Sequence, residues 1–245
     1  MAEEYAARAS GMGALERLGF RVMLGRLRRF DLRGAQGVDD FIANSAVVRE
    51  RIQRIYHRDA VVIHPPVDVD RFHPAVAVSD YYLVVAELVP YKRIDLAVAA
   101  CSSLGRKLVV VGDGPELQAL RRLAGPTVEF RGRLKDVEVS RLMATCRAFI
   151  HPQIEDFGIA AVEAQAAGRP VIAFRGGGAL ETVVPAETGV FFDVQSEQAL
   201  THAIVELESS LPALLSDACR KQAERFNSGR FRRELRSFLA SRGYM

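Results

Sequence analysis

Two glutamates separated by seven residues, Glu155 and Glu163, could bind a polar ligand. The segment Phe157-Gly158-Ile159 lies between them and is expected to open a helix, so its backbone N–H groups have no intrahelical acceptor. These N–H groups and the positive end of the helix dipole favour anions and hydroxyl oxygens. Glu163 lies about six residues into this helix, roughly 9 Å along its axis. The two carboxylates can therefore hold different parts of one long ligand.

Short apolar strands alternate with helices around these residues. The expected strands are 38–43, 61–64, 81–85, 108–111, 128–130, 148–150, 171–174 and 189–192. The expected helices are 46–56, 93–103, 116–123, 136–146, the one that begins at 157–159, 179–184, 197–208, 212–225 and 230–239. From residue 81 onward this order predicts an α/β fold, a doubly wound parallel sheet with helices on both faces. Ligands of such sheets bind beyond the carboxyl ends of the strands, where Lys92, Glu155 and the segment after it are expected.

Several motifs occur together in this part of the chain. Glu155-x7-Glu163 is accompanied by Gly168-x-Pro170-Val171 and by Gly176-Gly177-Gly178-x-x-Glu181. This set resembles the retaining GT-B glycosyltransferases that use nucleotide-sugar donors (glycosyl transferases group 1), and it resembles their C-terminal, donor-binding half. The resemblance runs from about Val38 to Phe192 and more loosely to the C-terminus. Pro65-Pro66-Val67-Asp68 and Leu88-Val-Pro-Tyr-Lys-Arg-Ile-Asp95 look most like mannosyltransferases of cell-surface glycan assembly.

The resemblance implies a role for each site residue. Lys92 would stabilise the leaving diphosphate, and Glu155 would hold hydroxyls of the sugar; these are the expected catalytic residues. Donor-binding residues would be Phe157, Gly158 and Ile159 through their N–H groups, Glu163 at the ribose, and Arg133, Leu134 and Lys135 at the base. An ordinary charged loop explains Lys135 equally well. The donor would be GDP-mannose or a UDP-sugar, with no other cofactor and no metal, because cations replace the metal at the developing charge.

One position departs from the family pattern. Similar proteins carry an arginine five residues before the lysine at position 92, and this chain has Glu87 there. A carboxylate about 4 Å from a diphosphate costs several kcal/mol at an effective dielectric constant of about 20. Either Glu87 turns away and Arg93 or another cation replaces the arginine, or donor binding is weakened.

Other candidate residues have structural explanations. Gly112-Asp-Gly114-Pro115 lacks the third glycine of a dinucleotide-binding fingerprint and is predicted to be a strand-to-helix turn. His64 is predicted to end a strand, and His151 to have a structural or lining role. Gly176–Gly178 could cradle a phosphate, whereas the resemblance implies a flexible loop near the donor with Glu181 capping the short helix that follows.

The resemblance divides the chain into three parts. Residues 1–60 correspond to the last pieces of an N-terminal acceptor-side domain (helix, strand, helix), residues 61–225 to the nucleotide-sugar-binding domain, and residues 226–245 to a C-terminal helix that packs back toward the N-terminal domain. Pro65–Asp68 is expected to be a stiff linker. Residues 1–36 read as a helix interrupted by glycines. Its arginines suit either a solvated domain surface or peripheral contact with an anionic membrane face.

Residues 1–60 are too few for an acceptor domain of ordinary size, so several interpretations stay open. The chain could be a fragment of a transferase, a subunit completed by an acceptor-domain partner, or a scaffold whose site has decayed, which Glu87 fits. A hydrolase using Glu155 and Glu163 as acid and base is a fourth interpretation. Exposed apolar surface, and with it self-association, is expected near residues 15–45 and 230–240.

The amino-acid composition excludes several other classes of protein. The chain has 245 residues, of which 49% are hydrophobic, and its net charge of +3 does not favour nucleic-acid binding. Three cysteines and five histidines without ligand spacing indicate reduced thiols and no zinc site. The beginning of the chain lacks the apolar core of a signal peptide, and no apolar run of about 18 residues is present. We therefore expect a cytoplasmic protein, with peripheral attachment to the inner membrane face as the alternative.

Overall fold

The fold is taken from a computed structural model that describes residues 13–75, 77–210 and 215–244. Six parallel strands form the main sheet in the order β5-β4-β3-β6-β7-β8. Their bounds are β3 (Tyr82–Val85), β4 (Leu108–Val111), β5 (Val128–Gly132), β6 (Ala148–His151), β7 (Val171–Phe174) and β8 (Gly189–Phe192). The strand order reverses between β3 and β6. The prediction of a doubly wound parallel sheet is confirmed, and its topological switch point lies between these two strands.

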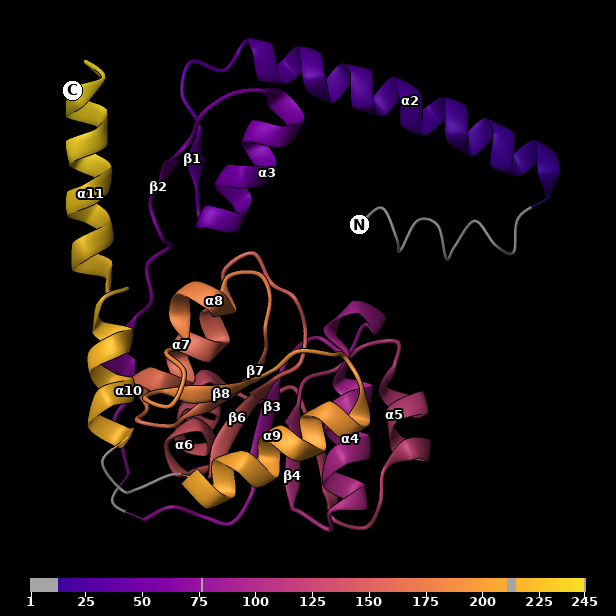
Figure 1. Ribbon diagram of the computed structural model, residues 1–245, viewed down its shortest axis with the longest axis vertical. Helices are drawn as coiled ribbons and strands as arrows, with labels where there is room; N and C mark the ends of the chain where they lie inside the picture. Colours follow the sequence, from indigo (N-terminus) through magenta and orange to yellow (C-terminus); the bar gives the residue numbers. More distant parts are fainter. Residues whose placement is uncertain (1–12, 76, 211–214, 245) are drawn as a thin grey trace.

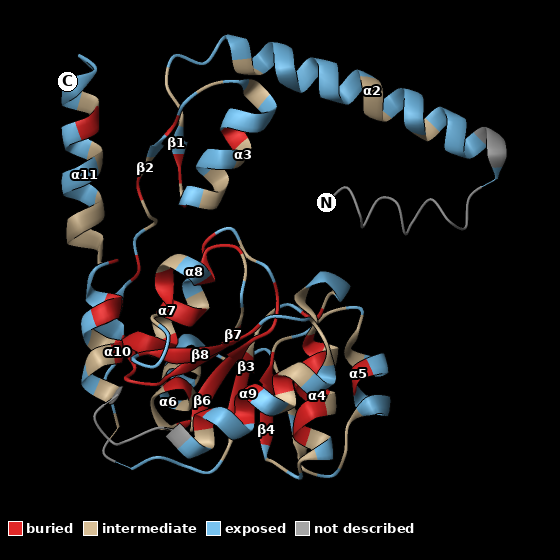
Figure 2. Cartoon of the chain, viewed as in Figure 1, coloured by how far each residue is buried: buried red, intermediate tan, exposed pale blue. Residues whose placement is uncertain are grey.

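Helices cover both faces of this sheet (Figure 1). One face carries α6 (Asp136–Thr145), α7 (Ile159–Ala166) and α10 (Leu215–Glu224); the other carries α4 (Ile94–Ser103), α5 (Leu117–Leu123) and α9 (Glu197–Ser210). Alternate residues of each strand point to opposite faces: Leu83 belongs to the first core, and Tyr82 and Val84 to the second. The strands are therefore apolar on both sides, as Figure 2 shows by their burial.

The N-terminal segment, residues 13–63, forms a smaller unit. It contains α2 (Ala14–Gln36), β1 (Ile42–Ala43), α3 (Ala46–Tyr56) and β2 (Val61–Val62). β1 and β2 pair in parallel, with Ile42 opposite Val61, so the strand at 61–62 lies with this segment, two residues beyond the expected boundary at residue 60. Its buried core consists of Ala43, Ile52 and Ala60.

The long helix α2 differs from the prediction. It continues without a break through Gly19, Gly25 and Gly34, which were expected to interrupt it. Each glycine costs about 1 kcal/mol relative to alanine, and leucine and arginine, both good helix formers, surround them. Residues 1–12 of the predicted helix lie outside the described residues. The strand expected at 38–43 shortens to Ile42–Ala43 because only these residues find a pairing partner.

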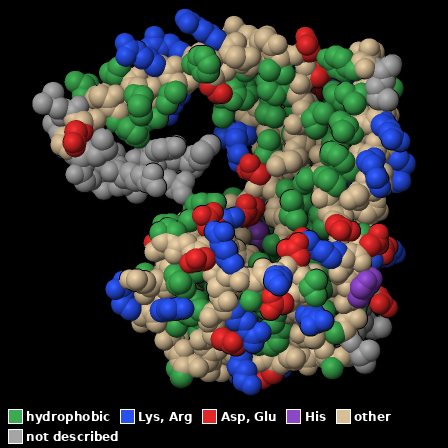
Figure 3. Space-filling view, turned by 180° about the vertical axis from the view of Figure 1, so that it is seen from behind, with side chains coloured by type: hydrophobic (Ala, Val, Ile, Leu, Met, Phe, Trp, Pro, Cys, Tyr) green, Lys and Arg blue, Asp and Glu red, His purple; other side chains and the backbone are tan. Residues whose placement is uncertain are grey.

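Much of α2 is exposed to solvent (Figures 2 and 3). Leu18 is 61% exposed and Phe30 is 76% exposed, and arginine side chains gather along the outer edge of the helix. The exposed apolar surface expected near residues 15–45 is therefore present. The one expected near residues 230–240 is absent, since none of the large hydrophobic residues there is exposed and Phe238 is buried. No described helix combines the length and the hydropathy that crossing a bilayer requires.

The chain crosses between the two units twice, at residues 64–67 and at residues 226–228. The crossings lie side by side, because the N–H of Val67 donates to the carbonyl of Phe226 over 2.9 Å. The final helix, α11 (Ser228–Ser241), lies with the N-terminal segment: Arg242 pairs with Asp40 at 3.2 Å, and the Tyr244 hydroxyl contacts the same carboxylate. In Figure 1, α11 and the N-terminal segment lie on the same side of the main sheet, the side of its carboxyl ends. The 13–63 segment and α11 therefore face the predicted site.

Candidate functional site

The switch point of the sheet brings Lys92 and Glu155 together. The chain leaves β3 and reaches Lys92 through a short 3₁₀ turn, η2 (Pro90–Lys92), and it leaves β6 four residues before Glu155. The Lys92 ammonium forms an ion pair with the Glu155 carboxylate, and Gln153 donates to the same oxygen at 3.3 Å. Both charged side chains are largely shielded, with 15% and 26% of their surfaces exposed. The two residues predicted to be catalytic, 63 positions apart, thus form one unit.

Neither residue 87 nor Arg93 supplies the positive charge of the arginine that similar proteins carry at position 87. The Glu87 side chain is exposed, and it has no ion-pair partner within the described part of the chain. Arg93 begins α4 in the left-handed region (φ 51°), and its guanidinium donates two 3.1 Å hydrogen bonds to Asp95. The Arg93 guanidinium therefore pairs with Asp95 in the first turn of α4 and does not lie beside the Lys92 ammonium.

The start of α7 provides the expected backbone donors. Gly158 caps the helix with φ 88°, and the first helical hydrogen bonds are donated by Ala161 and Val162 to its carbonyl. The N–H groups of Gly158 and Ile159 precede these bonds, as the sequence predicts. The Phe157 ring is buried in the core, so only its backbone can face a ligand, whereas the Ile159 side chain is 46% exposed.

His151 lies directly beneath this helix start. A Cβ atom on Gly158 would be 3.1 Å from the His151 Nε2, which explains the glycine in addition to its positive φ. His151 is 1% exposed, and neither ring nitrogen has a hydrogen-bond partner among the described residues. Burial lowers the pKa of His151 to about 4, while the nearby Glu155 carboxylate acts in the opposite direction. The imidazole is therefore neutral at neutral pH.

The loop at Gly176–Gly178 packs closely against the backbone of the loop that carries Glu155. The N–H of Gly178 donates to the Glu155 carbonyl at 2.8 Å. A Cβ on Gly177 would be 2.2 Å from that same oxygen, and one on Gly178 would be 2.3 Å from the Phe157 Cα. Gly177 and Gly178 are buried, so they hold the loop against the Glu155 backbone instead of forming an open phosphate cradle.

The prediction for Glu181 was wrong. It lies inside α8 (Ala179–Thr182) and does not cap it. Its carboxylate instead accepts from the N–H of Ala46 in the N-terminal segment and contacts His64. No local pattern indicates this contact, because it spans 135 positions.

Glu163 has a partner that the sequence did not reveal. Arg71, in the 3₁₀ turn η1 (Val69–Arg71), contacts the Glu163 carboxylate at 2.7 Å and Asp136 at 3.0 Å. Burial raises the pKa of Glu163, and Arg71 opposes that shift. No local pattern distinguishes Arg71 from other surface arginines, because its contacts come from residues 65 and 92 positions away.

The loop after β5 carries the three residues expected at the base. Arg133 and Lys135 are exposed, while Leu134 packs against the core. Lys135 caps α6 with its backbone, whose N–H donates to Glu138 at 3.1 Å. Asp136 begins the same helix, so the Arg71 and Glu163 pair lies next to this loop.

The turn at Gly112–Pro115 has the structural role that was predicted. The N–H of Leu88 donates to the Asp113 carbonyl at 2.9 Å, and a Cβ on Gly112 would be 1.8 Å from the Ala86 carbonyl oxygen. Two strand-end loops can therefore touch only because residue 112 is glycine. Searching the described residues finds no cluster of His, Cys, Asp and Glu suited to a metal ion.

The chain is similar to one protein family and to several curated proteins. The family model "Glycosyl transferases group 1" matches residues 70–226. A GDP-mannose-dependent alpha-(1-6)-phosphatidylinositol monomannoside mannosyltransferase of Mycobacterium tuberculosis H37Rv is 36% identical over 173 residues, 58% of this chain and 45% of that protein. The enzyme of the same name from Mycolicibacterium smegmatis is 32% identical over 195 residues, 66% of this chain and 51% of that protein. The chain spans about half the length of the curated relatives it matches.

Solved structures share the fold at lower identity. Sucrose-phosphate synthase from Thermosynechococcus elongatus superposes with a TM-score of 0.78 at 22% identity, covering 87% of this chain and 61% of that one. Anabaena Alr3699/HepE in complex with UDP and glucose gives 0.77 at 21% identity, covering 87% and 66%. These likenesses establish the architecture of the six-stranded sheet and its helices.

Proposed function

The chain belongs to the glycosyl transferases group 1 family, a GT-B glycosyltransferase family, and from this premise we propose that it binds a nucleotide-sugar donor and supplies the donor half of a retaining sugar transfer. The observation that carries the proposal is the Lys92–Glu155 ion pair at the switch point of the sheet. It joins a cation and a hydroxyl acceptor where a doubly wound sheet binds its ligand. GDP-mannose is the first candidate donor, because several relatives are named as GDP-mannose-dependent mannosyltransferases.

The proposed chemistry assigns each group a task. As the bond between sugar and diphosphate breaks, negative charge grows on the diphosphate, and the Lys92 ammonium stabilises it. Glu155 accepts hydrogen bonds from the sugar hydroxyls, and the N–H groups at Gly158 and Ile159 donate to ligand oxygens. The acceptor hydroxyl attacks from the face that the diphosphate leaves and passes its proton to the departing diphosphate, so the anomeric configuration is retained. Before the donor arrives, Glu155 and Lys92 neutralise each other, which keeps both side chains ordered.

The far end of the donor would lie along α7 and the β5 loop. Glu163 would accept from the ribose hydroxyls, and Arg133, Leu134 and Lys135 would line the base. Arg71 already pairs with Glu163, so a ribose would share this carboxylate with the guanidinium. The raised pKa of Glu163 is consistent with a partly buried carboxylate held for a ligand.

We infer that the acceptor binds opposite this face, on a further domain or a separate partner. The residues named above all lie on the sheet domain, residues 67–226, and a GT-B enzyme works in a cleft between two domains. Self-association through the exposed apolar side of α2 is the alternative way to complete such a cleft.

Glu87 favours a second candidate function. A carboxylate where similar proteins have an arginine weakens diphosphate binding and lowers the stabilisation of the leaving group. The second candidate is therefore a nucleotide-sugar-binding subunit that does not itself transfer sugar.

Calorimetric titration with GDP, UDP, GDP-mannose and UDP-glucose tests the proposal. We expect binding that requires the nucleotide and that weakens about 10- to 150-fold in Lys92→Ala, the loss of one charge-assisted hydrogen bond. Glu163→Ala should weaken GDP as well as GDP-mannose, since it would lose contacts to the ribose. Lys107→Ala is the matched control, because Lys107 is exposed at the opposite edge of the same sheet.

Different outcomes separate the two candidates. Binding together with release of GDP from GDP-mannose in the presence of an acceptor supports transfer. Binding without release, even with an arginine introduced as Glu87→Arg, supports the binding subunit. If none of the four ligands binds to the folded chain, both candidate functions are refuted.

A further inference from the structure

The two chain crossings form a narrow hinge between the N-terminal segment and the sheet domain. At this hinge the Arg230 guanidinium donates to the carbonyl of His64 at 2.8 Å. The His64 ring lies edge-on to Phe226, with ring centroids 5.3 Å apart, and Phe157 packs against both rings. Phe157 belongs to the loop that carries Glu155, so the hinge touches the candidate site directly.

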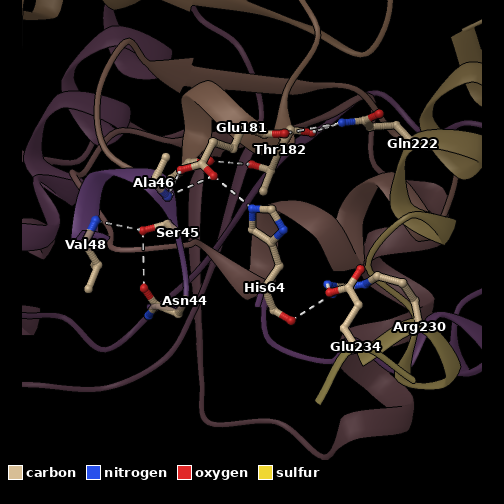
Figure 4. A network of polar contacts seen from close by, with 11 residues as sticks. Asn44, Ser45, Ala46, Val48, His64, Glu181, Thr182, Gln222, Arg230 and Glu234 are labelled. Atoms are coloured by element: carbon tan, nitrogen blue, oxygen red, sulfur yellow. Dashed lines mark hydrogen bonds and ion pairs between the residues drawn. The ribbon is translucent and has the colours of Figure 1, made fainter. Parts of the chain in front are cut away.

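Glu181 makes a second contact between the two units. Both Glu181 carboxylate oxygens accept from the N–H of Ala46, at 2.9 and 3.1 Å, and one contacts the His64 Nε2 at 2.8 Å (Figure 4). Ala46 is the first residue of α3, so its N–H lacks an intrahelical acceptor. A carboxylate at this position satisfies that donor and the positive end of the helix dipole. Ser45 caps the same helix within its own segment, through its contact with Val48.

The element that carries Glu181 is fixed to the sheet domain on several sides. Gln165 and Gln222 both donate to the carbonyl of Thr182, at 3.0 and 3.2 Å. On its other side, Gly178 binds the Glu155 carbonyl at 2.8 Å without room for a side chain. If α3 moves and pulls α8 with it, the backbone at Glu155 must therefore be displaced as well.

A further tie joins α3 to the same loop. Arg51 of α3 pairs with Asp156, the residue after Glu155, at 2.9 Å. Both side chains are about half exposed, so this pair alone contributes little. Together with Glu181 it connects α3 to the site loop at two points.

We propose that Glu181 is a positioning residue that couples the placement of α3 to the loop carrying Glu155. The Ala46 N–H of the N-terminal segment and His64 of the first crossing bind its carboxylate, and the Gly178–Glu155 hydrogen bond passes any displacement on to the site. When α3 moves away from the sheet domain, the carboxylate loses its partners and the Glu155 loop loosens. This mechanical coupling needs no ligand; its effect on a bound nucleotide rests on the proposed function.

Amide hydrogen exchange of the ligand-free chain tests the coupling. In Glu181→Ala we expect the Ala46 amide to exchange about five- to thirtyfold faster, the loss of one helix cap. The Gly178 amide should exchange faster as well, although its own acceptor is untouched. Glu187→Ala is the matched control, because Glu187 is an exposed glutamate in the turn after α8. Faster exchange at Ala46 alone would show an ordinary cap and overturn the proposal.

A second variant keeps the test decisive if Glu181→Ala does not fold. Glu181→Gln keeps the shape and one acceptor but removes the charge, so it should raise exchange at both amides by a smaller factor. Arg51→Ala combined with Glu181→Gln should raise exchange at Gly178 by more than the product of the two single effects. Independent effects that simply multiply would contradict a shared connection.

Added GDP separates this proposal from the proposed function. In the unaltered chain we expect GDP to slow exchange at Ile159, at the donor site, and at Ala46 through the coupling. In Glu181→Ala the slowing at Ile159 should persist and the slowing at Ala46 should vanish. GDP that slows neither amide in the unaltered chain refutes nucleotide binding but not the coupling, which the ligand-free measurement decides. Slowing at both amides in Glu181→Ala would refute the coupling.

Discussion

At the amino-terminal edge of the main sheet, Glu208 is surrounded by hydrogen-bond partners, whereas at the carboxyl edge His151 has no hydrogen-bond partner among the described residues. The Glu208 carboxylate accepts from the Tyr82 hydroxyl at 2.8 Å, from two nitrogens of Arg106 at 2.8 Å each, and from Arg147 at 3.0 Å. Tyr82 is buried, and the two arginines precede β4 and β6.

The carboxyl edge uses its polar groups differently. Lys92 and Glu155 pair with each other, and burial raises the pKa of Glu163. Neither nitrogen of His151 has a hydrogen-bond partner in the described part of the chain, and an unpaired buried group costs free energy. The amino-terminal edge thus satisfies its polar groups within the fold, whereas the carboxyl edge, where we propose the donor site, does not.

Among variants that test this difference between the two edges, Glu208→Ala should cause the largest loss of stability. It leaves Arg106 and Arg147 close together without their common partner and leaves the Tyr82 hydroxyl unpaired. We expect a loss of about 2–3 kcal/mol in the free energy of unfolding, measured by urea denaturation. Glu197→Ala, an exposed glutamate in the first turn of the same helix, should cost less than about 1 kcal/mol. Equal losses in the two variants would mean that the Glu208 cluster has no special role.

The two edges should also respond to pH in opposite directions. Hydrogen bonding to Arg106 lowers the pKa of Glu208 from 4.5, so its contribution is present above pH 4.5 and is lost as the pH falls through the folded-state pKa. Burial raises the pKa of Glu163 from 4.5, so its contribution is present below pH 4.5 and is lost as the pH rises. Urea unfolding from pH 3 to pH 7 checks this.

The matched variants are Glu208→Gln and Glu163→Gln. The stability advantage of the unaltered chain over Glu208→Gln should shrink below pH 4.5, and the advantage over Glu163→Gln should shrink above it. Parallel pH profiles for the two variants would break the comparison.

Tyr82→Phe removes one hydroxyl from the amino-terminal cluster. Its ring stays packed in the core between the sheet and α9, so only the hydrogen bonds of the hydroxyl, to Glu208 and to Arg147, are lost. We expect about 1 kcal/mol of destabilisation, seen as a lower urea midpoint with an unchanged slope. Tyr81→Phe gives a useful reference, because Tyr81 bonds to the Leu142 carbonyl and to Thr145, away from Glu208. A Tyr82→Phe variant as stable as the unaltered chain would show that the arginines alone satisfy Glu208.

The smallest effect, with the opposite sign, is expected for His151→Leu. Replacing a buried group that has no hydrogen-bond partner by an apolar one is nearly neutral or stabilising, by up to about 1 kcal/mol. The same variant should bind the nucleotide sugar less well if the imidazole contacts a ligand. A clear loss of stability would indicate that His151 is a packing residue like those of the amino-terminal edge.

Local sequence patterns predicted most of the sheet domain. The strands at 108–111, 171–174 and 189–192 were predicted with their observed bounds, because each is an apolar run between turn residues. The Lys92 and Glu155 pair could be expected from the fold, since both follow strands that end at the same edge. The capping role of Glu181 was predicted wrongly, and the tight packing of Gly177 and Gly178 was not predicted, because both depend on which backbone lies against them.

The N-terminal segment was predicted less well. Glycines suggested breaks in α2 that are absent, and the strand at 38–43 is shorter than the pattern indicated. The low helix propensity of single glycines does not break α2, because the residues around them favour a helix. The strand β1 extends only as far as its pairing partner β2.

The sequence by itself determined the alternation of strands and helices, the doubly wound sheet and the edge at which its charged residues gather, because hydrophobic periodicity and parallel crossovers leave few other arrangements. Only the tertiary structure decided that Arg71 contacts Glu163 and that Glu181 reaches Ala46 and His64. Those contacts join residues 92, 135 and 117 positions apart, and their geometry depends on how whole elements pack, which no local pattern encodes.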